Sequence, residues 1–279
     1  MMIPLQILAL VLALAAPSAV QDGSGPLLVS GARVLASDGG GWLEGRVLLV
    51  EDGRIARIAE AGAFTAPAGA RVLRLDGTWV VPGLIDLHSH LLLHPYDEAP
   101  WADQVLKESL ELRTIRAVVA ARATLEAGFT TLRELGTEGA GYADVALRDA
   151  IAADIVVGPR IFAATRALVA TGCYGPSGFD PRWDVPKGAQ VADGALGVRI
   201  AVREQIAAGA DWIKVYADYR RKPGAASTPT YSRAELEAIV DEARSAGIPV
   251  AAHASTDEAI APRLSPKPRT KATAGGSIA

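Results

Sequence analysis

Three of the chain's four histidines lie close together, in the segment "VVPGLIDLHSHLLLH" that ends at His94. Residues two apart in a strand share a face, so we expect His88 and His90 to point the same way, with Ser89 on the other side. Two imidazoles at the end of a buried strand could bind one metal ion, although an isolated His-x-His is more often just a polar strand end. We expect His94, beyond the strand, to be a loop residue and not a ligand.

Two more candidate ligands lie in later strand-like segments. Lys214 lies in "DWIKVYAD", where alternation places Lys214 and Tyr216 on one face. A lysine in a buried strand is costly unless its charge is removed or paired, and a neutral amine can add carbon dioxide to become an anionic carbamate. A surface position or a pair with Asp211 or Asp218 explains this lysine equally well. His253 ends "PVAAH" and could be a third nitrogen ligand, although a lone histidine is more often a core or rim residue.

The loops that follow these strands offer contacts for a substrate. Tyr216, Tyr219 and Arg220 lie in "KVYADYRRKPG", and Arg220 could hold a carboxylate through two hydrogen bonds, although solvation or a surface salt bridge is commoner. Cys173 in "VATGCYGPSGF" could be a nucleophile, but no histidine lies near it in the sequence. A structural cysteine in a glycine-rich loop is the favoured interpretation.

The residues around these candidates predict two kinds of architecture. Short β segments separated by Asp-Gly turns predict a small β-sheet unit at 27–81. From Pro82 onward, apolar strands alternate with helices, which predicts an α/β fold with a parallel sheet. We expect strands at 84–88, 130–133, 160–164, 212–217 and 249–253, and helices at 103–127, 142–153, 196–208 and 232–246. An open sheet and a β/α barrel both satisfy this alternation, but no G-x-G-x-x-G or P-loop favours a nucleotide-binding open sheet.

Composition restricts the possible partners and the cellular location. Half of the residues are hydrophobic and the formal net charge is −3, which indicates a globular protein without a broad basic surface for nucleic acid. The apolar stretch within residues 1–20 is short for a membrane span and predicts a signal peptide, hence export to the periplasm or the medium. We expect no stable membrane span beyond it. With one cysteine, no internal disulfide can form.

The opening motif resembles the amidohydrolase superfamily when it is taken with "TTLRELG", "ATRALVATG", "GADWIKVYADYR" and "PVAAHASTDE". More narrowly, the chain is similar to the imidazolonepropionase-like branch that includes Xaa-Pro dipeptidases (prolidases). The resemblance implies a TIM-type (β/α) barrel with a small β-sandwich and one or two divalent metal ions, usually Zn²⁺. His88 and His90 match the first-strand ligands, Lys214 the carbamylated lysine that bridges the metals, and His253 the fifth-strand histidine.

The resemblance also implies an activity. Zinc lowers the pKa of bound water and polarises a carbonyl, so that hydroxide attacks an amide bond. We therefore expect a metal-dependent hydrolase of C–N bonds in a small-molecule substrate, such as an Xaa-Pro dipeptide or an N-acyl amino acid. Lys214 and His253 would be its catalytic residues, and Tyr216, Tyr219 and Arg220 its substrate-binding residues. A homo-oligomer is compatible with this expectation.

The chain departs from the family pattern after the fifth strand. No histidine follows His253, and Asp257 comes too soon to match the family's aspartate at the eighth strand. Only 197 residues run from Gly83 to the end, whereas a complete barrel needs about 250. We expect a truncated chain with a partial barrel at 82–260 and a disordered or out-of-frame tail at 261–279. The alternatives are a catalytically dead metal-binding or interaction protein and a cysteine-nucleophile amidase.

Overall fold

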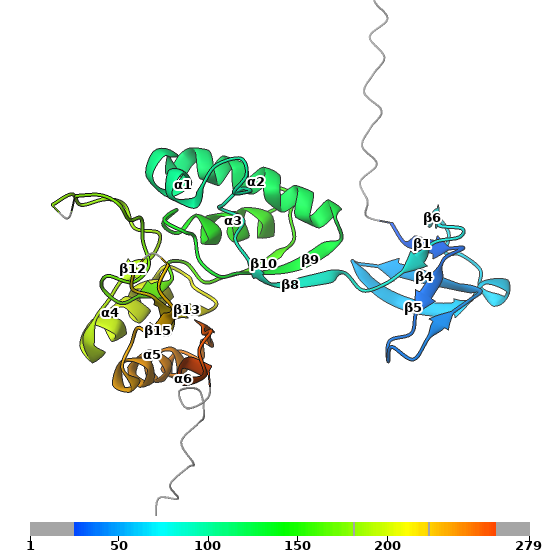
Figure 1. Ribbon diagram of the computed structural model, residues 1–279. Coiled ribbons are helices and arrows are strands. Elements are labelled where there is room, and N and C mark those ends of the chain that lie inside the picture. Colours follow the sequence, from blue (N-terminus) through cyan, green and yellow to red (C-terminus); the bar gives the residue numbers. More distant parts are fainter. Residues whose placement is uncertain (1–24, 181, 223, 261–279) are drawn as a thin grey trace, which may run out of the picture. The chain divides into compact units, whose positions relative to one another are not determined.

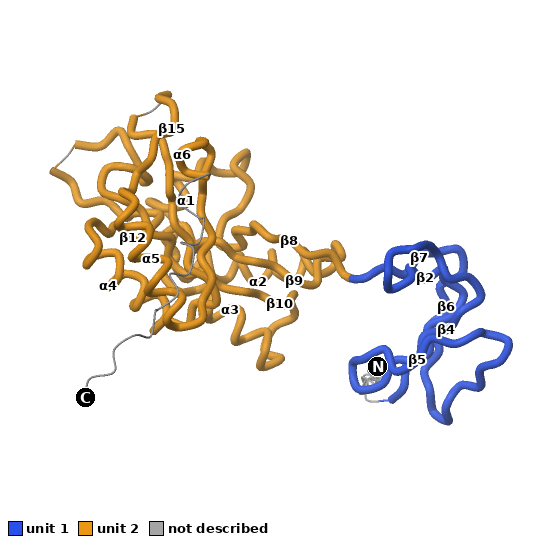
Figure 2. The backbone as a smooth tube through the Cα atoms, turned by 90° about the horizontal axis from the view of Figure 1, so that it is seen from below, with its two compact units in different colours: residues 1–82 blue, residues 83–279 orange. Residues whose placement is uncertain are grey.

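The computed structural model describes residues 25–180, 182–222 and 224–260. The expected signal peptide at 1–20 and the expected tail at 261–279 lie outside the described residues. The chain divides into two compact units, residues 1–82 and residues 83–279, which Figure 2 colours separately.

The first unit contains two small β-sheets. One has the strand order β5-β4-β1-β6 and the other the order β3-β2-β7. Its core is formed by Leu28, Val47 and Leu49. The Asp52-Gly53 turn joins β4 to β5 with φ angles of 49° and 70°, the left-handed pair that a tight hairpin requires. The strands are β1 (Leu27–Ser30), β2 (Arg33–Leu35), β3 (Trp42–Leu43), β4 (Arg46–Glu51), β5 (Arg54–Glu60), β6 (Arg71–Arg74) and β7 (Trp79–Val80), and a short 3₁₀ turn spans Ala61–Ala63.

The second unit contains two parallel sheets (Figure 1). The first sheet has the order β10-β9-β8, formed by β8 (Leu84–Ser89), β9 (Phe129–Glu134) and β10 (Arg160–Ala163). The second sheet has the order β12-β11-β13-β16, formed by β11 (Leu168–Val169), β12 (Gln190–Val191), β13 (Ile213–Tyr216) and β16 (Val250–His253). The five strands expected after Pro82 are thus confirmed. An antiparallel hairpin of β14 (Asp218–Arg220) and β15 (Ser227–Pro229) follows β13.

Helices precede or follow most of these strands. The single helix expected at 103–127 is wrong, because the chain forms α1 (Trp101–Lys107) and α2 (Leu110–Glu126) with a break between them. Ser109 begins α2 as its N-cap and accepts a hydrogen bond from the backbone of Leu112. The other helices are α3 (Ala143–Ala152), α4 (Gly194–Ala207), α5 (Arg233–Ser245) and the short α6 (Asp257–Ile260).

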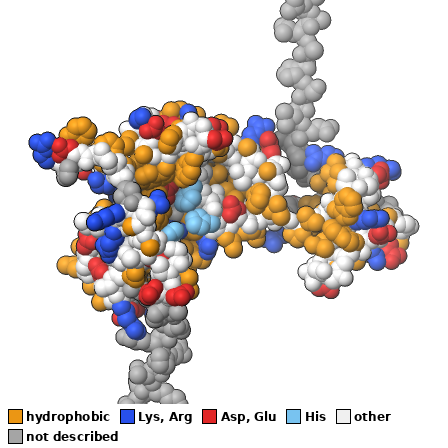
Figure 3. Space-filling view, in the orientation of Figure 1, with side chains coloured by type: hydrophobic (Ala, Val, Ile, Leu, Met, Phe, Trp, Pro, Cys, Tyr) orange, Lys and Arg blue, Asp and Glu red, His pale blue; other side chains and the backbone are white. Residues whose placement is uncertain are grey.

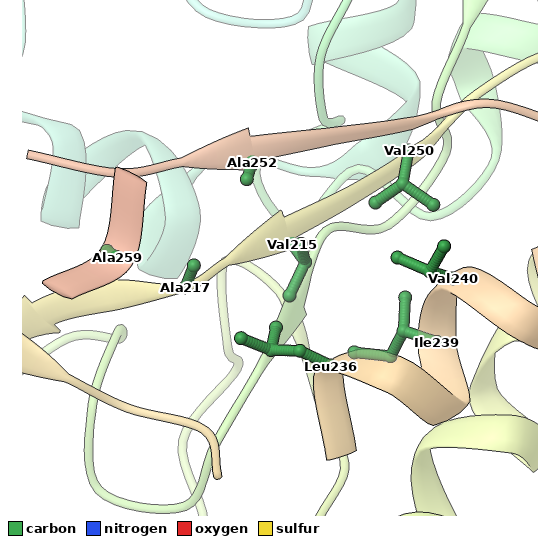
Figure 4. Close-up of a pocket in the computed structure, with 8 residues that line it drawn as sticks. All are labelled: Val215, Ala217, Leu236, Ile239, Val240, Val250, Ala252 and Ala259. Carbon is green, nitrogen blue, oxygen red and sulfur yellow. The ribbon is translucent and has the colours of Figure 1, made fainter. Parts of the chain in front are cut away.

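Each sheet buries one face against helices. In the second sheet, Ile213 and Val215 of β13 pack on α4 and α5, while the alternate residues Lys214 and Tyr216 point to the opposite face. A cavity of about 10 Å³ lies in this packing (Figure 4). Its lining is wholly apolar, so it offers a water molecule no partners and is a packing gap instead of a ligand site.

The strands of the second unit support the α/β expectation, and apart from the β14-β15 hairpin they form two separate parallel sheets. The backbone N–H groups of Asp211 and Trp212 donate to the carbonyl oxygen of Ala163 at 2.7 and 3.2 Å, so the end of β10 lies beside the start of β13. This contact links the two sheets of the unit. Among the described residues, no helix has the length and apolar character needed to cross a membrane.

Candidate active site

The two histidines of the first strand lie together, as their spacing predicts. The rings of His88 and His90 are 5.2 Å apart between centroids. Nδ1 of His90 lies 3.0 Å from the carbonyl oxygen of Gly136, and because a carbonyl only accepts, Nδ1 carries the proton and Nε2 keeps a free lone pair. Burial lowers the pKa of His88 to about 4, with the positive charge of Lys214 as the next cause. The imidazole of His88 is therefore neutral near neutral pH.

Lys214 is buried without a partner. Its side chain is 2% exposed, and no hydrogen bond or ion pair from another described residue reaches it. The closest interaction is with the ring of Tyr216, whose centroid lies 5.5 Å from Nζ. Burial lowers the pKa of Lys214 to about 8, against the opposing charge of Glu138. A substantial neutral fraction of this amine is therefore available near neutral pH.

The two aspartates that could have paired with Lys214 are engaged elsewhere. Asp211 accepts a hydrogen bond from Arg148 at 2.8 Å. Asp218 accepts from the backbone of Ser255 and Thr256, at 2.7 Å in each case. The ion-pair explanation of Lys214 is therefore wrong, because the carboxylates that flank it in the sequence are both satisfied by other groups.

His253 lies at the end of β16, near Lys214 and Tyr216. Its ring stacks on Tyr216 with centroids 5.0 Å apart, and its Nε2 is 3.9 Å from Oδ1 of Asp218. Burial lowers the pKa of His253, and the charge of Lys214 lowers it further. Lys214 thus acts electrostatically on His253 and on His88, which belong to different sheets.

These contacts bring His88, His90, Lys214 and His253 to one face of the second unit, at the carboxyl ends of its strands. Figure 3 shows histidine side chains gathered on that face. Within the described residues, no group of three or more His, Cys, Asp and Glu side chains has the geometry of a metal site.

Glu138 is a buried site residue that the sequence patterns did not single out. It follows β9 in a loop and has a φ angle of 51°, a left-handed conformation that costs a non-glycine residue about 1 kcal/mol. Its Oε2 accepts hydrogen bonds from Trp101 Nε1 at 2.9 Å and from the hydroxyl of Tyr174. Its Oε1 lies 3.8 Å from Nδ1 of His90. Glu138 thus ties the histidine strand to an aromatic wall.

The aromatic wall consists of Trp101, Tyr174, Tyr216 and Tyr219. Tyr174 stacks on Tyr216 with centroids 4.4 Å apart, and it also lies 5.0 Å from Trp101 and 5.2 Å from Tyr219. Tyr216 is only 6% exposed between Tyr174 and His253, so its position suits support of the wall. Tyr219 and Arg220 line an adjacent cavity, where the Arg220 guanidinium lies 5.4 Å from the Tyr219 ring centroid.

The remaining reactive residues have structural roles. His94 is a loop residue, as expected, and both of its ring nitrogens lie 2.8 Å from carboxylates, those of Glu98 and Glu108. Burial raises the pKa of Cys173, which disfavours the thiolate that a nucleophile needs. Burial also raises the pKa of Glu134 well above its usual value, and this carboxyl accepts a hydrogen bond from the backbone of Leu91.

Comparisons with known proteins agree with this geometry. Residues 79–266 match the family described as "Amidohydrolase family". A crystal structure of a prolidase complexed with N-methylphosphonate-L-proline superposes with a TM-score of 0.72 at 34% identity, over 86% of this chain and 59% of that chain. A Xaa-Pro dipeptidase with bound methionine gives 0.72 at 27% identity, over 84% and 58%.

Sequence relatives cover a similar share of the chain. An imidazolonepropionase of Rhizorhabdus wittichii is 28% identical over 242 residues, which is 79% of this chain and 56% of that protein. An uncharacterised protein of Mycobacterium bovis is 28% identical over 215 residues, which is 76% of this chain and 47% of that protein. The chain thus spans about half the length of the curated relatives it matches.

Proposed function

Because this chain belongs to the amidohydrolase family, whose members generally bind divalent metals, we propose that it hydrolyses C–N bonds with one or two such ions. The substrate class is an Xaa-Pro dipeptide or an N-acyl amino acid. The observation that carries the proposal is the buried residue Lys214, which pairs with no described carboxylate and lies beside imidazoles from two different sheets.

The chemistry of the four side chains supports the proposal of a divalent metal such as Zn²⁺. His88 and His90 would supply ring nitrogens from β8, and His253 would supply a third from the second sheet. Neutral Lys214 adds carbon dioxide at Nζ and releases a proton, which gives a carbamate with the anionic oxygens that the four side chains otherwise lack. A metal held there would polarise the scissile carbonyl and lower the pKa of the attacking water.

The chain's own residues would orient the substrate. Arg220 and Tyr219 line the cavity beside the histidines and are placed to hold a carboxylate. Tyr216 supports His253 by stacking, and Asp218 fixes the loop after β16 through Ser255 and Thr256. These contacts would keep the imidazole and the substrate carboxylate in a constant relation during the reaction.

The test combines metal analysis with turnover. The chain is expressed with added zinc and bicarbonate, its metal content is measured by mass spectrometry, and hydrolysis of an Xaa-Pro and N-acyl amino acid panel is followed by amine release. Lys214→Met should lose both metal and turnover, because it keeps the length of the side chain but removes the amine. Turnover that persists in a metal-free protein would contradict the proposal.

Two other outcomes assign other functions. Bound metal without turnover would favour a metal-binding protein that lacks catalysis. Turnover that resists chelators and disappears in Cys173→Ala would favour a cysteine amidase. We also propose export through residues 1–20, which N-terminal sequencing of the mature protein tests, and self-association, which light scattering tests.

A further inference from the structure

A cavity of about 740 Å³ lies beside the candidate active site. Its walls come from the start of α1, the loop at 172–177 and the segment around β14. A cavity of this volume is in the range that binds small molecules. It is also far larger than the packing gap behind β13, so it is a candidate for a ligand-binding space.

The inner wall of the cavity is aromatic and rigidly held. Trp101, Tyr174 and Tyr219 line it, with Tyr96 beside them. Glu138 lies behind this wall and accepts hydrogen bonds from Trp101 and Tyr174, while Tyr216 stacks on the other side of Tyr174. Because these rings are fixed before any ligand binds, an apolar or planar group can pack on them without a large ordering cost.

The outer wall is positively charged. Lys187, Arg220, Arg221 and Lys222 line it, and none of the lining residues in the described part of the chain is Asp or Glu. Arg221 donates to the carbonyl oxygen of Pro229 at 3.0 Å, and no described carboxylate pairs with Arg220, Arg221 or Lys222. Lys187 lies 4.0 Å from the fully exposed Asp184, a weak pair.

This charge is local, because the whole chain carries a formal net charge of −3. Figure 3 shows Lys and Arg side chains close to the histidines on the same face. A single carboxylate needs only one guanidinium for a two-point hydrogen bond. Arg220 is sufficient for that carboxylate, so a mono-anionic substrate would leave Arg221 and Lys222 without an anionic partner and Lys187 with only its weak pair to Asp184.

We propose that the substrate carries two carboxylates: it is a dipeptide or N-acyl amino acid with an acidic side chain besides its terminal carboxylate. The inference rests on the proposed function and specifies its substrate class. The terminal carboxylate lies at Arg220, the acidic side chain meets Arg221, Lys222 and Lys187, and the acyl group packs on the aromatic wall.

Two nearly isosteric ligands test the proposal in the full chain. N-benzoyl-L-glutamate and N-benzoyl-L-glutamine differ by one negative charge, and their binding is measured by calorimetry at low and at physiological salt. The glutamate compound should bind about tenfold more tightly, because one charge-assisted hydrogen bond contributes roughly that factor. The preference should shrink as salt rises.

Two variants test which residues cause the preference for the glutamate compound. The double variant Arg221→Gln with Lys222→Gln should remove the preference, and both side chains are exposed, so the fold should remain intact. Arg122→Gln is the matched control, because Arg122 is exposed on α2 and pairs there with Glu126. This variant should keep the preference for the glutamate compound. Equal affinity for the two ligands, a preference that survives the double variant, or no detectable binding of either would overturn the proposal.

The same experiment separates this inference from the proposed function. Binding requires neither turnover nor bound metal, so a charge preference in a protein without hydrolytic activity would retain the subsite and reject the hydrolase. Hydrolysis of neutral and acidic substrates at equal rates, with equal binding, would retain the hydrolase and reject the subsite.

Discussion

The strands β8 and β13 both supply candidate ligands, yet their surroundings differ sharply. Every residue of β13 is buried, because the strand pairs with β11 on one side and β16 on the other and packs on α4 and α5. In contrast, β8 is the edge of its sheet, with Ile85 and Leu87 exposed by 61% and 59%. One half of the site thus lies in a packed interior and the other half on an open edge.

This difference indicates how the two halves work. Lys214 is held in one position by its neighbours, so its burial and its lowered pKa are properties of the packed sheet. His88 and His90 depend mainly on local contacts, such as the hydrogen bond of His90 to Gly136. An exposed apolar edge strand also exposes unpaired backbone groups, which is a risk for aggregation.

The largest expected effect comes from matched isoleucine truncations in the two sheets. Ile213 on β13 is fully buried, so Ile213→Ala should lower the free energy of unfolding by about 4 kcal/mol. Ile85 on β8 is 61% exposed, so Ile85→Ala should change it by only about 0.5 kcal/mol. Urea denaturation of the two variants measures this, and similar losses would mean that β8 is covered in solution.

Two buried aspartates, Asp144 and Asp218, should make the free energy of unfolding depend on pH in different ways. Asp144, at the start of α3, accepts hydrogen bonds from the backbone of Thr165 and Val145, but burial outweighs them and raises its pKa from 3.8 to about 6. The folded state binds this proton more tightly than the unfolded chain. The free energy of unfolding should therefore fall by roughly 3 kcal/mol as the pH rises from about 4 to about 6.

The pKa of Asp218 shifts in the opposite direction. Burial of Asp218 is outweighed by hydrogen bonds from Ser255 and Thr256, which lower its pKa below 3.8, so its stabilising contribution is already complete above that pH. Denaturation of the wild type and of Asp144→Asn at several pH values isolates the Asp144 effect. If both proteins show the same pH profile, Asp144 is not the cause.

Glu138 connects the two halves, and its removal should have an intermediate effect. Glu138→Ala leaves the donors of Trp101 and Tyr174 without their acceptor, which should cost about 2 kcal/mol. Glu138→Gln keeps one acceptor oxygen and should recover more than half of that loss. Unfolding curves give the stability, and the emission of Trp101 reports whether its contact is lost, which a purely global effect would not change.

Much of the second unit could be predicted from the sequence. The strands that carry His88, Lys214 and His253 were expected within two residues of their observed bounds. They are short apolar runs, and those of Lys214 and His253 begin soon after an Ala-Gly pair that ends a helix. The common face of Lys214 and Tyr216 followed from strand alternation alone. The break between α1 and α2 was missed, since the helical periodicity continues across Ser109.

Long-range contacts account for what was missed at the site. The lack of a partner for Lys214 depends on where Arg148, Ser255 and Thr256 lie, and no local pattern shows this. Glu138 lies in a loop, where periodicity gives no information. The only available signal was its place in "GTEGAG", an acidic residue among glycines directly after a strand.

The smallest expected effect compares the helix caps of the two layers. Ser232 begins α5 with the reciprocal capping box that its spacing to Glu235 predicts: its hydroxyl accepts from the Glu235 backbone, and the Glu235 side chain accepts from the Ser232 backbone at 2.7 Å. Ser109 begins α2 with a single bond of 3.2 Å from Leu112. Ser232→Ala should therefore cost about 1 kcal/mol and Ser109→Ala about 0.5 kcal/mol. Thermal unfolding of both variants checks which loss is larger. A larger loss for Ser109→Ala would mean that the helices over the β10-β9-β8 sheet contribute more stability than the exposed strand β8 suggests.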